Sequence, residues 1–228
     1  MAYHRYAIYF TLPKGPLADL AADWLGWDAA AGEPHRHPEL ARLTSEVAEI
    51  TEAPRRYGFH GTIKPPFRLT TAASADDLAA ALAAFCDAES PVVLHGVALG
   101  RIGSFLALRP VGATAALDRL AAEAVVRLDQ FRAPPDLTEL ERRRAARLTR
   151  RQEAMLQRWG YPYVMEEFRF HMTLTGPLSE PDLAAAEAAL EAHLVPALPA
   201  PFTIDALSLM GEDEAGRFHQ ISRIALTG

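Results

Sequence analysis

The chain has 228 residues, half of them hydrophobic and 23% charged, and its formal net charge is −6 at pH 7. This acidic balance excludes a global basic field for binding a nucleic acid backbone, so long nucleic acid is not the expected partner, although a local basic pocket is compatible with it. The single cysteine, Cys86, excludes an intrachain disulfide and a multi-cysteine metal site. No apolar run approaches the ~18 residues that span a bilayer, so we expect a cytoplasmic protein without a membrane partner.

Hydrophobic patterning predicts mixed strands and helices in the first half of the chain. Between its first helix and the next extended segment lies a proline-broken stretch in which 40–50 is either helical or irregular. The predicted elements are a strand over 3–11, a helix over 17–27, an extended segment over 56–66 that two prolines end, a helix capped by Ser74 and Asp77, and strands over 92–99 and 105–110.

A helical section over 113–165 separates this half from the last third, which repeats the earlier order of elements. The predicted elements are a helix over 114–131, a second helix that begins with a capping box at Thr138 and Glu141 and whose apolar face runs to Gly160, a strand over 167–175, a helix capped by Ser179 and Asp182, and strands over 202–210 and 218–226.

Two segments of the chain match each other without a gap. Phe, His, Thr and Pro recur at the same places in 59–67 and 170–178, about 111 residues apart. That period is too long for a solenoid and predicts two similar lobes related by a pseudo-twofold axis. We therefore expect a single α+β domain over 1–228 with antiparallel sheets lining a central cleft. Its expected parts are a lobe over about 50–112, a helical insert over about 113–165 and a lobe over about 166–228.

The matched segments each hold a His-x-Thr element, at His60 and at His171. Side chains alternate along a strand, so residues two apart share a face. One polar face is then predicted for each strand, and the opposite face of the second strand is wholly apolar. The polar faces consist of His60, Thr62 and Lys64 in the first strand and of Arg169, His171, Thr173 and Thr175 in the second.

Such faces suit a phosphate ester. Its cleavage needs a base for the attacking group, an acid for the departing oxygen, and donors that hold the equatorial oxygens. Histidine titrates near neutral pH, so His60 and His171 can serve as base and acid without a metal or other cofactor, and the sequence leaves open which is which. Thr62 and Thr173 would hold phosphoryl oxygens, while Lys64 or Arg169 would offset charge.

The two motifs, Phe59–Ile63 and Phe170–Leu174, resemble the paired motifs of the 2H phosphoesterase superfamily. The longer strings 56–67 and 158–165 are similar to its DUF1045-like branch, often encoded with phosphonate-degradation genes. The resemblance covers nearly the whole chain and implies a metal-independent phosphoesterase of the cyclic phosphodiesterase type. It also implies a small phosphorylated or cyclic-phosphate sugar or nucleotide as substrate. Thr175, from its place on the polar face, and Tyr57 are further candidate substrate contacts, although packing is the simpler role for Tyr57. The insert departs from the minimal superfamily pattern, and its length alone raises the prospect that it caps the cleft.

Several alternatives remain open at this level. Processing of RNA 2′,3′-cyclic or 2′-5′ ends would need a basic rim, and a phosphate sensor would bind without turnover. A metalloenzyme would need a carboxylate near the histidines, which the spacing does not offer. The arginines over 142–158 fit a solvated helix face better than phosphate contacts. Weaker candidates are a metal site at His35 and His37, substrate contacts at Arg217 and His219, and Tyr9, for which packing is the simpler role.

Overall fold

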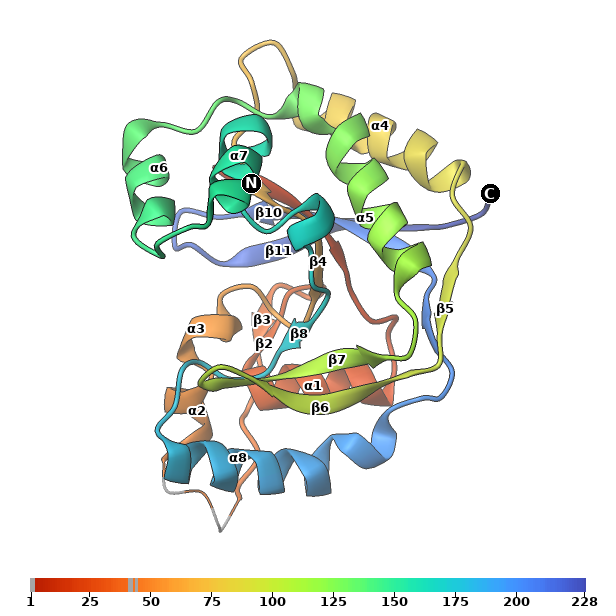
Figure 1. Ribbon diagram of the computed structural model, residues 1–228. Helices are drawn as coiled ribbons and strands as arrows, with labels where there is room; N and C mark the ends of the chain where they lie inside the picture. Colours follow the sequence, from red (N-terminus) through yellow and green to blue (C-terminus); the bar gives the residue numbers. More distant parts are fainter. Residues whose placement is uncertain (1–2, 41–42, 44) are drawn as a thin grey trace.

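The computed structural model describes residues 3–40, 43 and 45–228, and in this part of the chain a seven-stranded antiparallel sheet forms the centre of the fold (Figure 1). The expected class, α+β with antiparallel pairing, is confirmed. From one edge to the other the strands are β11 (Phe218–Ala225), β10 (Ala206–Glu212), β1 (Arg5–Phe10), β4 (Gly61–Phe67), β8 (Met172–Thr173), β7 (Phe105–Val111) and β6 (Gly96–Ile102). Outside it, β2 (Trp27–Asp28) pairs with β3 (Glu33–Pro34) and β5 (Val92–Leu94) with β9 (Phe202–Ile204).

The two strands that follow the histidines are direct neighbours in the middle of this sheet, where Gly61 pairs with Met172. Each repeat also contributes a two-stranded hairpin, and each hairpin lies in the half of the sheet that holds the histidine strand (β4 or β8) of the other repeat. The β6–β7 hairpin of the first repeat pairs with β8 of the second, whereas β10–β11 of the second repeat lies in the same half as β4. The segments 50–112 and 166–228 therefore do not form separate lobes as expected, because each builds part of both halves of one continuous sheet.

Helices cover the apolar face of each half of the sheet. The helices α4 (Ala75–Asp87) and α5 (Ala115–Arg127) pack on β10, β11 and β4, and α8 (Glu180–His193) packs on β6 and β7 (Figure 1). The predicted capping box at Ser74 and Asp77 opens α4, which buries Leu78, Leu82 and Phe85. The helix α1 (Pro16–Leu25) contacts the chain just after β8, because Trp24 Nε1 donates a 2.8 Å hydrogen bond to the carbonyl oxygen of Leu174.

The section over 113–165 contains helices, but the single helix predicted from Thr138 to Gly160 is two helices in the structure, and the first begins earlier than predicted. The side chain of Asp136, rather than Thr138, caps that helix by accepting a 2.8 Å hydrogen bond from Glu139 N. Gly160 ends the last helix in a left-handed conformation, as expected. The insert comprises α5, the 3₁₀ turn η1 (Asp129–Phe131), α6 (Leu137–Arg144), α7 (Arg150–Trp159) and the 3₁₀ turn η2 (Met165–Glu167).

The two strands predicted to carry the histidines are shorter or shifted in the structure. The strand expected over 167–175 is reduced to β8, because Glu167 lies in η2 and the Thr175 side chain replaces a ladder bond by accepting a hydrogen bond from Leu106 N at 3.0 Å. The first His strand begins only at Gly61 and continues through both prolines, which lie within the first of two register shifts against β1. The remaining short elements are α2 (Val47–Ile50), α3 (Glu52–Arg55) and η3 (Val195–Ala197).

The segment over 40–50, predicted to be helical or irregular, ends in the short helix α2. Positions 41, 42 and 44 lie outside the described residues. Within the described part of the chain, the helices are all too short or too polar to cross a membrane.

Candidate active site

The register of the two central strands brings both His-x-Thr elements to one face. Because β4 and β8 run antiparallel with Gly61 opposite Met172, the next pairs outward are His60 opposite Thr173 and Thr62 opposite His171. Residues directly opposite each other in an antiparallel pair project to the same side. His60, Thr62 and Thr173 accordingly line one cavity of about 640 Å³. The sheet thus joins two segments 111 residues apart into one polar patch.

Both histidines are oriented by the same local hydrogen bond. His60 Nδ1 donates to the carbonyl oxygen of Gly58 at 2.9 Å, and His171 Nδ1 donates to that of Arg169 at 2.8 Å. A carbonyl oxygen can only accept, so in each neutral ring Nδ1 carries the proton and Nε2 is left as the acceptor. The acceptor lies two residues before the histidine in both repeats. Two equivalent Nε2 atoms are thereby available for proton transfer.

The environment of His60 keeps its imidazole neutral. Its ring stacks on Tyr9 with the ring centroids 3.9 Å apart and the planes 23° apart, and Thr62 Oγ1 lies 3.3 Å from its Nε2. Burial lowers the pKa of His60 to about 4, and the nearby charge of His171 acts in the same direction against the Gly58 hydrogen bond. His60 is therefore unprotonated at neutral pH and suited to accept a proton.

The cavity is basic although the chain is acidic. Its lining includes four arginines and, among the described residues, no carboxylate. Arg5 forms a bidentate ion pair with Glu212 through its Nε and one Nη atom. Arg142 and Arg143 line the cavity from α6. Besides small residues and prolines, the lining consists of Arg5, Tyr9, Arg56, Tyr57, His60, Thr62, Phe105, Arg142, Arg143, Tyr161, Tyr163, Thr173 and Thr175.

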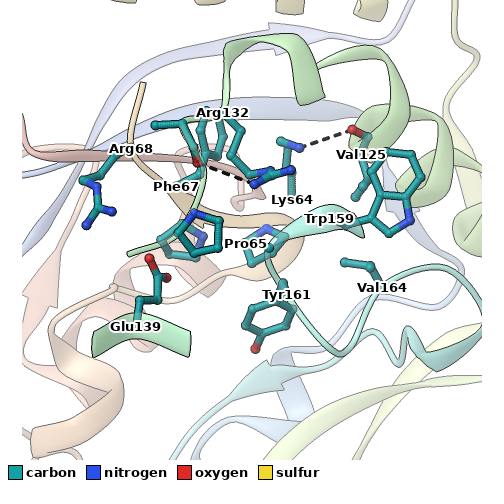
Figure 2. Close-up of a pocket in the computed structure, with 14 residues that line it drawn as sticks. Lys64, Pro65, Phe67, Arg68, Val125, Arg132, Glu139, Trp159, Tyr161 and Val164 are labelled. Carbon is teal, nitrogen blue, oxygen red and sulfur yellow. Dashed lines mark hydrogen bonds between the residues drawn. The ribbon is translucent and has the colours of Figure 1, made fainter. Parts of the chain in front are cut away.

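Lys64 does not share the face of His60, contrary to expectation. The pairs Tyr9 with Thr62 and Ile8 with Lys64 leave Ile63 as an extra residue, and this bulge turns Lys64 to the opposite side of the sheet. There its Nζ donates to the Val125 carbonyl oxygen at 3.2 Å (Figure 2). The same Nζ contacts Asp129 Oδ1 at 3.3 Å.

This environment makes Lys64 an anchor for the insert. Its side chain is 2% exposed, and burial lowers its pKa to about 8 in spite of the opposing charge of Asp129. Arg132 also binds Asp129, so two cations hold one carboxylate at the end of α5. The cluster attaches the chain that leads to α6 to the back of the first His strand.

The other expected substrate contacts have mixed positions. Arg169 is absent from the lining of the His cavity, because its guanidinium donates to the Glu166 carbonyl oxygen at 2.8 Å; its own carbonyl orients His171 instead. The prediction that Arg169 shares a face with His171 fails because the chain before His171 is not in a strand, so its side chains do not alternate. Thr175 and Tyr57 do line the cavity. The Tyr57 ring stacks on Phe218, with the ring centroids 5.1 Å apart.

The weaker candidates lie elsewhere. His35 Nδ1 is 2.9 Å from Asp23, and His37 Nδ1 donates to the Trp24 carbonyl oxygen at 3.0 Å. His219 is absent from the cavity lining and lies 2.8 Å from Asp213. In the described part of the chain no three His, Cys, Asp or Glu side chains gather as metal ligands would.

Sequence reasoning missed Arg5, Arg56, Tyr161 and Phe105 as lining residues. The strings 56–67 and 158–165 already contained two of them, since they include Arg56 and Tyr161. The other two gave no signal, because Arg5 and Phe105 stand at the ends of strands that only the fold brings to the cavity.

Comparison with known proteins places residues 62–219 in the family model described as "Protein of unknown function (DUF1045)". The Ribose 1,5-bisphosphate phosphokinase PhnN of Janthinobacterium sp. (strain Marseille) is 40% identical over 98% of this chain and 51% of that protein. Its namesake in Laribacter hongkongensis (strain HLHK9) is 34% identical over 96% and 51%, respectively. The chain thus spans about half the length of the curated relatives it matches.

Similar solved structures include E. coli LigT complexed with 3′-AMP, which is 15% identical with a TM-score of 0.46 and full coverage of both chains. A second, titled only as a phosphoesterase, is 15% identical with a TM-score of 0.44 and the same coverage.

Proposed function

The chain belongs to the DUF1045 family, and from its cavity we propose that it is a metal-independent phosphoesterase that opens a small cyclic phosphodiester. The observation that carries this proposal is the pairing of Gly61 with Met172, because continuing that antiparallel register outward brings His60, Thr62, His171 and Thr173 to one face of the sheet. The shared orientation of the two rings adds support, since each keeps Nε2 free of a backbone partner.

In the proposed reaction His60 acts as the base. Its Nε2 takes a proton from water while the water oxygen attacks phosphorus, forming a new P–O bond. The bond from phosphorus to one ring oxygen breaks, and His171 gives that oxygen its proton. The product is a phosphate monoester with a free hydroxyl, and the proton on His60 returns to His171 through solvent. His60 has the base role because its lowered pKa of about 4 leaves it neutral in the free protein.

Thr62 and Thr173 are proposed to hold the equatorial oxygens. Their hydroxyls lie opposite the histidine of the other strand, so each histidine is flanked by a donor from its partner strand. Hydrogen bonds from such donors gain strength as charge accumulates on the phosphoryl oxygens in the transition state. Thr175 is less suited to this role, because its hydroxyl already accepts from Leu106 N.

A phosphorylated ribose is the proposed substrate class. The cavity of about 640 Å³ lies within the range of roughly 300–1,000 Å³ typical of small-ligand sites. The curated relatives carry a name that refers to ribose 1,5-bisphosphate. Since this chain matches about half of each, that activity belongs to the longer proteins, and only the sugar phosphate class is carried over here.

The test is a turnover screen in EDTA with ribose and nucleoside 2′,3′-cyclic phosphates, followed by His60→Ala and His171→Ala. We expect turnover to persist in EDTA and each substitution to lower kcat by about 10²–10⁴-fold. His4→Ala is the matched control, because His4 is exposed and remote in sequence from both motifs.

Circular dichroism should report an unchanged fold in all three variants. Full activity of either catalytic variant would refute the assigned roles. Tight binding of every substrate without turnover would instead identify a phosphate sensor.

A further inference from the structure

We propose that the helical insert adds a second anion-binding subsite to the cavity, where Arg142 and Arg143 bind a phosphate monoester on the same substrate molecule. This inference rests on the proposed function, because it takes the two histidines as the place of the reacting phosphodiester. It assigns the insert a specificity role and names the substrate as one with two phosphoryl groups.

The position of α6 supports this subsite. Arg142 and Arg143 stand in its last turn, and both line the cavity that holds His60 and Thr173. The guanidinium of Arg143 lies over the ring of Tyr161, 4.5 Å from its centroid. Stacking on an aromatic ring fixes the plane of a guanidinium and leaves its edge free for hydrogen bonding. Arg143 is therefore held in place before any ligand arrives.

The charges around α6 are unbalanced toward the positive. Glu139 is the one carboxylate paired with these two arginines among the described residues, at 4.0 Å from Arg142 and 3.7 Å from Arg143. Both distances are longer than a hydrogen bond. Arg56, also in the lining, has no ion pair in the described structure. Arg142 and Arg143 thus share one loosely placed carboxylate, and Arg56 adds a third guanidinium to the cavity lining.

One donor in this group has no partner. Arg143 Nε is buried and makes no hydrogen bond within the described residues. An unpaired charged donor is costly, so an anion that pairs with this guanidinium would offset part of that cost. The neighbouring Arg144 provides the contrast, because its guanidinium makes three hydrogen bonds to Glu153 outside the cavity.

A phosphate monoester is the anion that this arrangement fits. Guanidiniums bind phosphate through two parallel hydrogen bonds, and a monoester carries about −1.5 to −2 charges at pH 7. The histidine end of the cavity offers hydroxyls and two imidazoles, which suit a singly charged diester. The two ends therefore differ in charge in the same sense as the two phosphoryl groups of the proposed substrate.

The experiment compares a matched substrate pair, ribose 2,3-cyclic phosphate with and without a 5-phosphate. We expect the wild-type protein to prefer the 5-phosphorylated compound in kcat/KM by about 10-fold or more. Arg143→Gln and Arg142→Gln should each reduce that preference. Arg150→Gln is the control, because it removes an exposed arginine of α7 that does not line the cavity and should keep the preference.

Equal kcat/KM values for the two substrates in the wild-type protein would overturn the subsite. So would a preference that survives Arg142→Gln and Arg143→Gln combined. If neither compound is turned over, the proposed function fails, and calorimetric titration with ribose 5-phosphate decides the subsite separately. Binding that is lost in the double arginine variant and kept in His60→Ala would sustain it, and any other pattern would refute it.

Discussion

Gly61 lies so close to Phe170 that a Cβ on the glycine would come within 2.2 Å of the phenylalanine Cζ. The ring of Phe170 therefore packs against bare backbone, one residue before His171. We expect Gly61→Ala to force the ring aside, to lower the free energy of unfolding by about 1–3 kcal/mol and to reduce turnover by displacing His171. Urea denaturation and kcat measurements check both effects.

Two further variants sharpen this prediction. Gly100→Ala is the control in another strand, because its added Cβ would meet only Arg109 Cδ at 3.6 Å, an ordinary contact. Phe170→Leu combined with Gly61→Ala should recover part of the lost stability. Wild-type stability in the single Gly61→Ala variant would show that the ring moves freely and would contradict the tight contact.

The buried imidazole of His60 makes stability depend on pH. Its pKa is about 4 in the folded protein and near 6.5 when unfolded, so between these values the unfolded chain binds more protons. Stability therefore rises with pH across this window and falls by up to roughly 3 kcal/mol as the pH drops through it. Chemical denaturation at pH 4.5 and 6.5 measures the difference.

His60→Gln isolates this contribution, because the amide does not titrate. The variant should lose less stability than the wild-type protein between the two pH values. An identical loss in both proteins would mean that the His60 pKa is not lowered.

Lys64→Met should leave catalysis nearly intact. The Lys64 ammonium faces Val125 and Asp129 behind the sheet, away from the cavity. Its removal leaves Arg132 as the partner of Asp129, so we expect a loss of stability while the groups that line the cavity stay in place. Steady-state kinetics should give a kcat/KM close to that of the wild-type protein. A loss of about 100-fold or more would restore Lys64 as a substrate contact.

The pH dependence of the free energy of unfolding of Lys64→Met should also differ from that of the wild-type protein at high pH. Between pH 8 and 10.5 the unfolded chain keeps the Lys64 proton that the folded protein has lost, so wild-type stability gains a rising contribution across this range. Lys64→Met lacks that contribution, and its stability should rise less with pH.

The cap of α6 provides a test of the insert. Asp136→Ala removes the side chain that accepts from Glu139 N and should destabilise this helix by about 1 kcal/mol. Thr138→Ala, at the position that the sequence predicted as the cap, should have a smaller effect. Hydrogen exchange of the α6 amides compares the two variants, and equal protection in both would contradict the assigned cap.

Strand alternation in the sequence predicted that His60 shares a face with Thr62, and His171 with Thr173. His60, Thr62 and Thr173 line the cavity, and the catalytic roles of the four residues stay a prediction. Alternation failed at Lys64 because a bulge at Ile63 shifts the register, and nothing in local composition marks such a bulge.

A different limit applies to the arginines of the insert. Arg142 and Arg143 were expected on a solvated face, because their neighbours in sequence are Glu139 and Glu141. The cavity that they line is formed by α6 together with residues from distant parts of the chain, so only the packing of the insert reveals it. Periodicity within one helix carries no information about what lies opposite that helix.

The exchange of hairpins between the two repeats has a consequence for assembly. The strand after His171 pairs with β7, which precedes it by more than sixty positions. Tyr9 and Tyr57, beside His60, pack on Phe218 at the start of β11. Neither half of the chain, expressed by itself, contains the neighbours that its own histidine needs. During translation the pocket can close only after the β10–β11 hairpin has left the ribosome.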